Sequence, residues 1–128
     1  MSERKCKDRI EKQLEGRKSD LHKLLKHGSD DMLGRLEDYA LCFDYVAPGT
    51  FDDQKEGYLR YQISWGGPSD EFRFFINPDL SCHRIEYWFL DWFDGASLIC
   101  TDDTTVLRLW DWLSETGASA NAVREAGQ

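Results

Sequence analysis

The side chains of this chain that could do chemistry are acids placed among aromatic residues. Five pairs of adjacent acids occur in the sequence, at 30–31, 37–38, 52–53, 70–71 and 102–103. The first and last pairs fall where a helix is expected to begin, and the dipole at that end of a helix favours negative charge. A smaller set lies at strand ends or turns beside aromatic residues: Asp70, Glu71, Glu86, Asp91 and Asp94. These five acids are the candidates for function.

Acids on a small sheet can hold the metal ion of a nuclease, but the residues around Glu86 do not fit that chemistry. A restriction-type nuclease needs the sequence Glu-x-Lys, whereas Glu86 is followed by two aromatic residues and the last lysine is Lys55. His22 and His27 are five residues apart, not the four that places two ligands on one helix face. No phosphate-binding glycine loop or serine-nucleophile motif occurs. We therefore expect no metal, no cofactor and no enzymatic activity.

Charge is distributed unevenly along the chain. Residues 1–28 hold nine Lys/Arg against five acids, whereas residues 29–128 hold seven Lys/Arg against nineteen acids. The second part therefore has a net charge of −12, within a chain total of −8. A folded body with this field repels nucleic acid and attracts basic protein surfaces. We expect a protein partner with a basic surface, and no direct binding of nucleic acid.

The spacing of the cysteines and the length of the apolar runs indicate in which cellular compartment the protein is expected. The four cysteines are scattered, one to each of four expected elements: Cys6, Cys42, Cys82 and Cys100. Without a Cys-x-x-Cys pair, such thiols are typical of buried small apolar residues in a reducing compartment. No apolar run of about 18 residues occurs. We expect a cytoplasmic protein without membrane contact, in the host cell cytoplasm if the gene is phage-borne.

Two helices are expected before the strands. Apolar residues recur at helical spacing from about residue 3 to His27, and Gly28 is a suitable stop. Ser29 is a suitable first cap for a second, short helix through about Tyr39.

The pattern then changes to period two, which predicts a sheet over residues 40–100. The expected strands span 41–46, 58–65, 72–76, 82–93 and 96–100, with Asp94-Gly95 as a hairpin turn. A helix is expected over 102–114, capped by Thr101 or Asp102, and residues 117–128 are expected to form a flexible tail. The prediction is one α+β domain over residues 1–116, with an antiparallel sheet of four to five strands, two N-terminal helices and one C-terminal helix.

The fourth expected strand is unusual because both of its faces are largely apolar. One explanation is that a terminal helix covers each face of the sheet. The other is that Trp88 and Trp92 form part of a contact surface, because tryptophan is enriched at interface hot spots. Trp112 is a further candidate, since it lies off the apolar stripe of its helix.

Two segments carry a resemblance. They are YQISWGGPSDEFR, residues 61–73, and YWFLDWFDG, residues 87–95. Both segments resemble segments of small accessory proteins carried by plasmids and phages, and the resemblance covers roughly residues 57–100. Size and acidity are also similar to those of anti-CRISPR and antirestriction proteins. The resemblance implies a protein that binds a nuclease complex, often at the basic surface meant for DNA.

These observations favour a non-enzymatic, acidic inhibitor that acts as a DNA mimic on a CRISPR effector or other host nuclease. Partner contacts are expected from the five candidate acids together with Trp88, Trp92 and Trp112. The alternatives are a homo-oligomeric accessory module of a mobile element, such as a homodimer, and a toxin-neutralising immunity protein.

Overall fold

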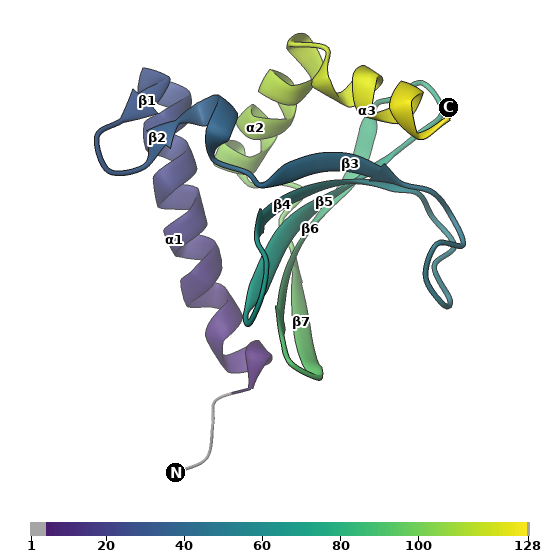
Figure 1. Ribbon diagram of the computed structural model, residues 1–128, viewed down its shortest axis with the longest axis horizontal. Helices are drawn as coiled ribbons and strands as arrows, with labels where there is room; N and C mark the ends of the chain where they lie inside the picture. Colours follow the sequence, from purple (N-terminus) through teal and green to yellow (C-terminus); the bar gives the residue numbers. More distant parts are fainter. Residues whose placement is uncertain (1–4, 128) are drawn as a thin grey trace.

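The computed structural model describes residues 5–127, in which a five-stranded antiparallel sheet is combined with three helices (Figure 1). The helices are α1 (Cys6–His27), α2 (Thr104–Glu115) and α3 (Ala118–Ala126). The sheet strands are β3 (Cys42–Val46), β4 (Tyr58–Ser64), β5 (Ser69–Ile76), β6 (Cys82–Asp91) and β7 (Asp94–Ile99). They lie side by side in chain order. The predicted α+β class and antiparallel sheet are confirmed.

Helix α1 follows the predicted pattern. Ile10, Leu14, Leu21 and Leu24 form its buried stripe. Gly28 adopts the left-handed conformation with φ of 81° and donates its N–H to the carbonyl of Leu24, so it ends the helix as predicted. The predicted helical positions Glu3 and Arg4 lie outside the described residues, as does Gln128 of the predicted tail.

The prediction of a second helix after Gly28 is wrong. Residues there form a small hairpin of β1 (Ser29–Asp30) and β2 (Gly34–Arg35), followed by a 3-10 turn, η1 (Leu36–Asp38). The Asp30 carboxylate accepts hydrogen bonds from the backbone N–H groups of Met32 and Leu33, at 2.9 and 3.1 Å. This local turn competes with a helix for the same backbone donors.

Several strand ends differ from the prediction, and β5 begins at Ser69, three residues earlier than expected. The register shifts between Gln62 and Ser64, so Trp65 leaves the strand and is 76% exposed. The hairpin turn after β6 consists of Trp92 and Phe93, whereas Asp94 and Gly95 belong to β7. Gly95 faces Leu90 across the two strands, and a Cβ added to it would lie 2.7 Å from Leu90 Cδ2. This glycine therefore allows a close approach between strands and does not form the turn.

The C-terminal region contains two helices where one was predicted. Asp103, rather than Thr101 or Asp102, caps α2 by accepting a hydrogen bond from the Val106 N–H. The expected flexible tail instead forms α3, with Ser119 and Ala122 buried. Small residues such as alanine favour helix, and α3 lies against β3.

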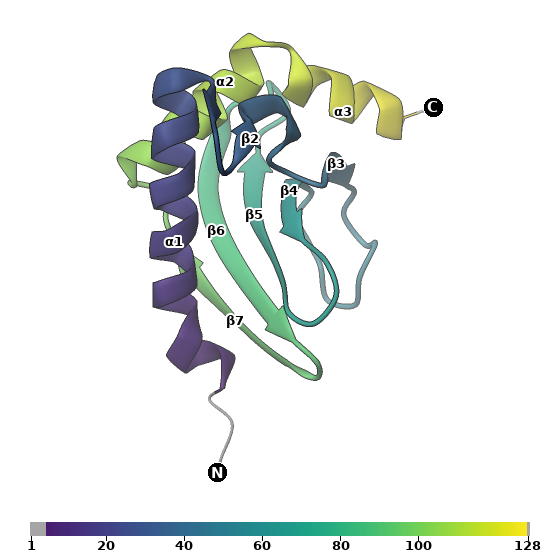
Figure 2. The same cartoon turned by 60° about the vertical axis from the view of Figure 1, so that its left-hand side comes forward.

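All three helices lie on one face of the sheet (Figure 2). Their buried side chains pack with Leu59, Phe72, Phe74, Ile85 and Tyr87, which share that face. The expectation that a terminal helix covers each face is therefore wrong, since no helix of residues 5–127 lies on the opposite face. None of the described helices is long and apolar enough to cross a membrane.

Candidate binding site on the open face of the sheet

The face of the sheet without helices, here called the open face, contains a cavity of about 880 Å³. Its floor consists of alternate residues of three strands: Tyr58, Arg60 and Gln62 of β4, Glu71, Arg73 and Phe75 of β5, and Arg84, Glu86 and Trp88 of β6. The loop between β3 and β4 and the side chain of Trp65 complete its walls. This cavity, the open-face pocket, has the size of pockets that bind small molecules or peptide side chains.

The pocket concentrates the few cations of the acidic part of the chain. Of the seven Lys/Arg after residue 28, four line it: Lys55, Arg60, Arg73 and Arg84. Arg60 and Arg73 stand directly opposite each other on β4 and β5, an arrangement that is unfavourable unless acids balance it. Asp44 accepts two hydrogen bonds from Arg60, at 3.0 and 2.8 Å.

Arg73 is held on three sides. Its Nε donates to Glu71 Oε2 at 2.7 Å, and Glu71 is only 3% exposed. The Arg73 guanidinium carbon lies 4.1 Å from the centre of the Trp88 ring and 4.9 Å from that of Tyr58. Cation–π contacts of this kind fix both the position and the plane of the guanidinium.

Trp88 and Arg84 are also held by neighbours on the open face. The Trp88 Nε1–H donates to Glu86 at 2.9 Å, and Glu86 also accepts from Arg84 Nε at 3.0 Å. Arg84 lies 3.9 Å above the Phe75 ring. The floor is therefore preorganised by a network of stacked rings and charge-assisted hydrogen bonds.

The Tyr58 hydroxyl is an exception in this network. It is buried and has no hydrogen-bond partner among the described residues. Burial raises the pKa of Tyr58, so its phenol keeps its proton at neutral pH. A buried hydroxyl without a partner costs about 1–3 kcal/mol, which a suitable ligand atom would recover.

The structure does not gather the five candidate acids into one patch, and their contact with a partner stays a prediction. Asp70 lies on the helix side, where Arg17, Ser64 and Tyr87 donate hydrogen bonds to its buried carboxylate. Glu71, its neighbour, is on the open face because adjacent strand residues point to opposite sides. Glu86 shares the open face with Glu71.

Asp91 and Asp94 hold the β6–β7 hairpin against the start of α1. Asp91 accepts from Arg9 at 2.6 Å, and Asp94 accepts from the backbone N–H of Cys6 at 2.7 Å. The bond from Cys6 lowers the pKa of Asp94. Arg9, like Arg17 at Asp70, thus pairs with an acid of the sheet, which the sequence pattern did not reveal.

The three candidate tryptophans also lie apart. Trp88 is in the open-face pocket, and Trp92 is 86% exposed at the hairpin turn with φ of 57°. Trp112 is half-buried beside the main core. Of the eight predicted residues, only Glu71, Glu86 and Trp88 line the pocket.

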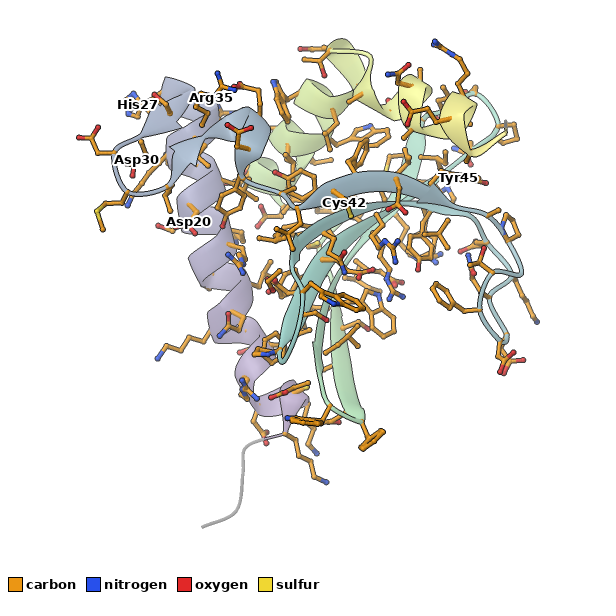
Figure 3. All side chains as sticks on the ribbon, viewed as in Figure 1. Asp20, His27, Asp30, Arg35, Cys42 and Tyr45 are labelled. Atoms are coloured by element: carbon orange, nitrogen blue, oxygen red, sulfur yellow. The ribbon has the colours of Figure 1, made fainter. Side chains whose placement is uncertain are left out.

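Other reactive groups lie outside the pocket. All four cysteines are free, and Cys6 and Cys100 are buried as predicted, but Cys42 is exposed and Cys82 half-buried. The polar residues Asp20, His27, Asp30 and Arg35 lie around α1 and its hairpin, away from Cys42 and Tyr45 on β3 (Figure 3). Within residues 5–127, no group of three or more His, Cys, Asp or Glu is arranged to hold a metal ion.

Comparisons of this chain with protein-family models, with curated proteins and with solved structures find no match. What this protein binds is therefore inferred from the geometry of the open-face pocket and from the charge around it.

Proposed function

We propose that this chain is a non-enzymatic binding protein that inhibits a nucleic-acid-targeting defence complex, of the anti-CRISPR or antirestriction type, in the host cytoplasm. The open-face pocket is its docking site. The observation that carries the proposal is the uncovered sheet face with Trp88, Tyr58 and Arg73 stacked at its centre. These are the residue types that dominate binding energy in protein interfaces, and here they are rigidly positioned.

Charge supports a basic partner. Three of the seven Lys/Arg of α1 are paired on the helix side, where Arg9 contacts Asp91, Arg17 contacts Asp70 and Lys18 contacts Asp103. These three acids are therefore already bonded within the chain. At the pocket, Asp52 and Asp53 form an exposed acidic rim on the β3–β4 loop. A partner with lysines or arginines around an apolar projection would complement this surface.

The proposed mechanism combines an aromatic anchor with an acidic rim. Since Glu71 and Glu86 are already bonded to arginines of the chain, they do not form a free track of negative charge. The rim acids would steer the approach of the basic surface, and Trp65 and Trp88 would provide buried contact area. Inhibition follows if the covered surface is the one that binds DNA.

The test uses purified CRISPR effector complexes and restriction enzymes, each with its fluorescent target DNA. We expect the protein to prevent DNA binding by at least one complex, measured by mobility shift. Trp65→Ala should raise the inhibitory concentration about tenfold, the equivalent of about 1.4 kcal/mol. Trp92→Asn is the matched control, because it removes an equally exposed tryptophan away from the pocket.

Two results would contradict the proposal. If no complex in the panel loses DNA binding, the inhibitor function is rejected. If Trp92→Asn weakens inhibition as much as Trp65→Ala, the open-face pocket is not the docking site. Inhibition should also weaken as salt rises, because exposed charges are screened within about 10 Å at 0.1 M salt.

A homodimer is the second candidate function, and one observation favours it. The hairpin turn exposes two adjacent aromatic side chains, Trp92 and Phe93, beside a small cavity that includes Arg9. Sedimentation at high micromolar concentration tests this alternative, since a strict monomer excludes it.

A further inference from the structure

We infer that the open-face pocket contains a carboxylate-binding subsite, formed by Arg73 and Tyr58, for a monocarboxylate carried on an aromatic body. This inference goes beyond the proposed function, because it concerns a small ligand bound by the protein alone. It uses the same pocket but does not require a defence complex.

Arg73 is the central group of the subsite. Its Nε is bonded to Glu71, and its two terminal nitrogens have no partner among the described residues. The rings of Trp88 and Tyr58 fix the plane of the guanidinium. Two parallel N–H donors on a fixed plane match the two oxygens of a carboxylate.

Tyr58 provides the second, independent observation. Its side chain is buried, it lines the pocket, and its hydroxyl has no partner among residues 5–127. A protonated phenol beside a guanidinium is a further hydrogen-bond donor for an anionic oxygen. Because the hydroxyl has almost no exposed area, the side chains over it must shift before one ligand oxygen can accept hydrogen bonds from both groups.

The charges around the subsite set the class of ligand. Three arginines on the floor face four acids, Asp44, Glu56, Glu71 and Glu86, and each of these acids already accepts a hydrogen bond from one of the arginines. The place for an anion is therefore local to the terminal N–H groups of Arg73, which have no partner among the described residues, and the surrounding acids disfavour a ligand with more than one negative charge. The free acids Asp52 and Asp53 at the rim add to this effect.

The walls of the pocket select the body of the ligand. Phe51, Trp65, Trp88 and Leu90 line the cavity of about 880 Å³. Aromatic rings stack well on such walls, and their burial contributes about 25 cal/mol for each Å². An indole or phenyl ring with one carboxylate fits both requirements.

The experiment measures binding of indole-3-acetate to the full protein by calorimetry and by NMR. Indole-3-acetamide is the matched neutral probe, since it has nearly the same shape without the charge. We expect the acetate to bind at least about tenfold more tightly than the amide. Equal binding of the two probes, or no binding of the acetate at about 1 mM, would overturn the inference.

Variants then locate the subsite. Tyr58→Phe removes one hydroxyl and should weaken acetate binding about fivefold, the equivalent of about 1 kcal/mol. Arg73→Lys keeps the charge but removes the paired donors, and should abolish the preference for acetate over amide. Arg108→Lys, an exposed site on α2, is the control. Unchanged acetate preference in Arg73→Lys would overturn the inference.

Two further measurements separate binding from folding and identify the source of the carboxylate. The double variant Glu71→Gln, Arg73→Gln removes both members of the ion pair, so neither charge is left unpaired, and it should also lose the acetate preference.

A peptide ending in tryptophan with a free carboxylate, compared with indole-3-acetate, shows whether a chain end or a free acid binds more tightly. Either source supports the subsite. If neither the peptide nor indole-3-acetate binds, the carboxylate-binding subsite is rejected, and the test of the inhibitor function is not affected.

Discussion

Arg17 donates two hydrogen bonds to the carboxylate of Asp70, at 2.7 and 3.1 Å, and so joins the middle of α1 to the start of β5. The hydroxyls of Ser64 and Tyr87 donate to the same carboxylate from β4 and β6. Asp70 is only 2% exposed. One buried carboxylate thus connects the helix with the three central strands.

The variant Asp70→Asn should be strongly destabilised. It keeps the shape of the side chain but leaves Arg17 without its counter-charge, so we expect a loss of about 3 kcal/mol in the free energy of unfolding. Urea denaturation measures it. The control is Arg35→Gln, which breaks an exposed pair with Asp38 and should leave the free energy of unfolding nearly unchanged. Equal losses would contradict the role given to Asp70.

Helix α3 should contribute to stability. Ala122→Glu places a carboxylate against the core and should cost about 2 kcal/mol or more, measured by thermal denaturation. The neighbouring change Asn121→Glu is the control, because position 121 is exposed. If both variants melt like the parent protein, α3 does not pack as described.

Acid should weaken the cap of α2. Burial alone would raise the pKa of Asp103, but hydrogen bonds from Lys18 and the Val106 N–H outweigh it, so the pKa is lowered. The stabilisation is present above the unfolded pKa, about 3.9, and is lost as the pH falls through the lower folded value. The free energy of unfolding should therefore decrease between about pH 5 and pH 3.

The variant Asp103→Asn isolates this contribution. Asparagine remains a good N-cap but cannot lose a negative charge, so the dependence on pH should become shallower. Urea titrations of both proteins over this range provide the comparison. An unchanged slope would show that Asp103 does not contribute to it.

One cysteine should react much faster than the others. Partial burial and Asp44 also raise the pKa of Cys42, but its side chain is exposed, whereas burial raises the pKa of Cys100 to about 12 and that of Cys82 to about 11. With a coloured disulfide reagent we expect one rapid reaction, and Cys42→Ser should remove it. Rapid reaction of Cys6 or Cys100 in the folded protein would contradict their burial.

Strong periodicity made the sheet predictable. The alternation of Leu59, Tyr61 and Ile63 and the turn signals after them predicted an antiparallel meander, which is confirmed. Other elements could not be predicted, because local hydrogen bonds or tertiary contacts determine their conformation. Asp30 forms a turn where a helix cap was expected, and the small residues of α3 become helical through contact with β3.

The candidate site was predicted only in part, because adjacency in sequence was taken as adjacency in space. Asp70 and Glu71 are neighbours in the chain but face opposite sides of β5. The pattern that could have located the pocket is the position of Arg60, Arg73 and Arg84 within the alternation of their strands. Once the strands are aligned, these three share one face with Trp88.

The opposite orientations of Asp70 and Glu71 also determine which genetic changes the protein can tolerate. Deleting Glu71 or Phe72 from β5, between Asp70 and Arg73, would reverse the facing of every side chain on one side of the gap. Either the carboxylate that anchors α1 or the arginine at the pocket would then face the wrong side. Substitutions on the open face should be accepted far more readily than single-codon deletions, so new specificity in this protein would arise by replacing side chains and not by changing the length of its central strand.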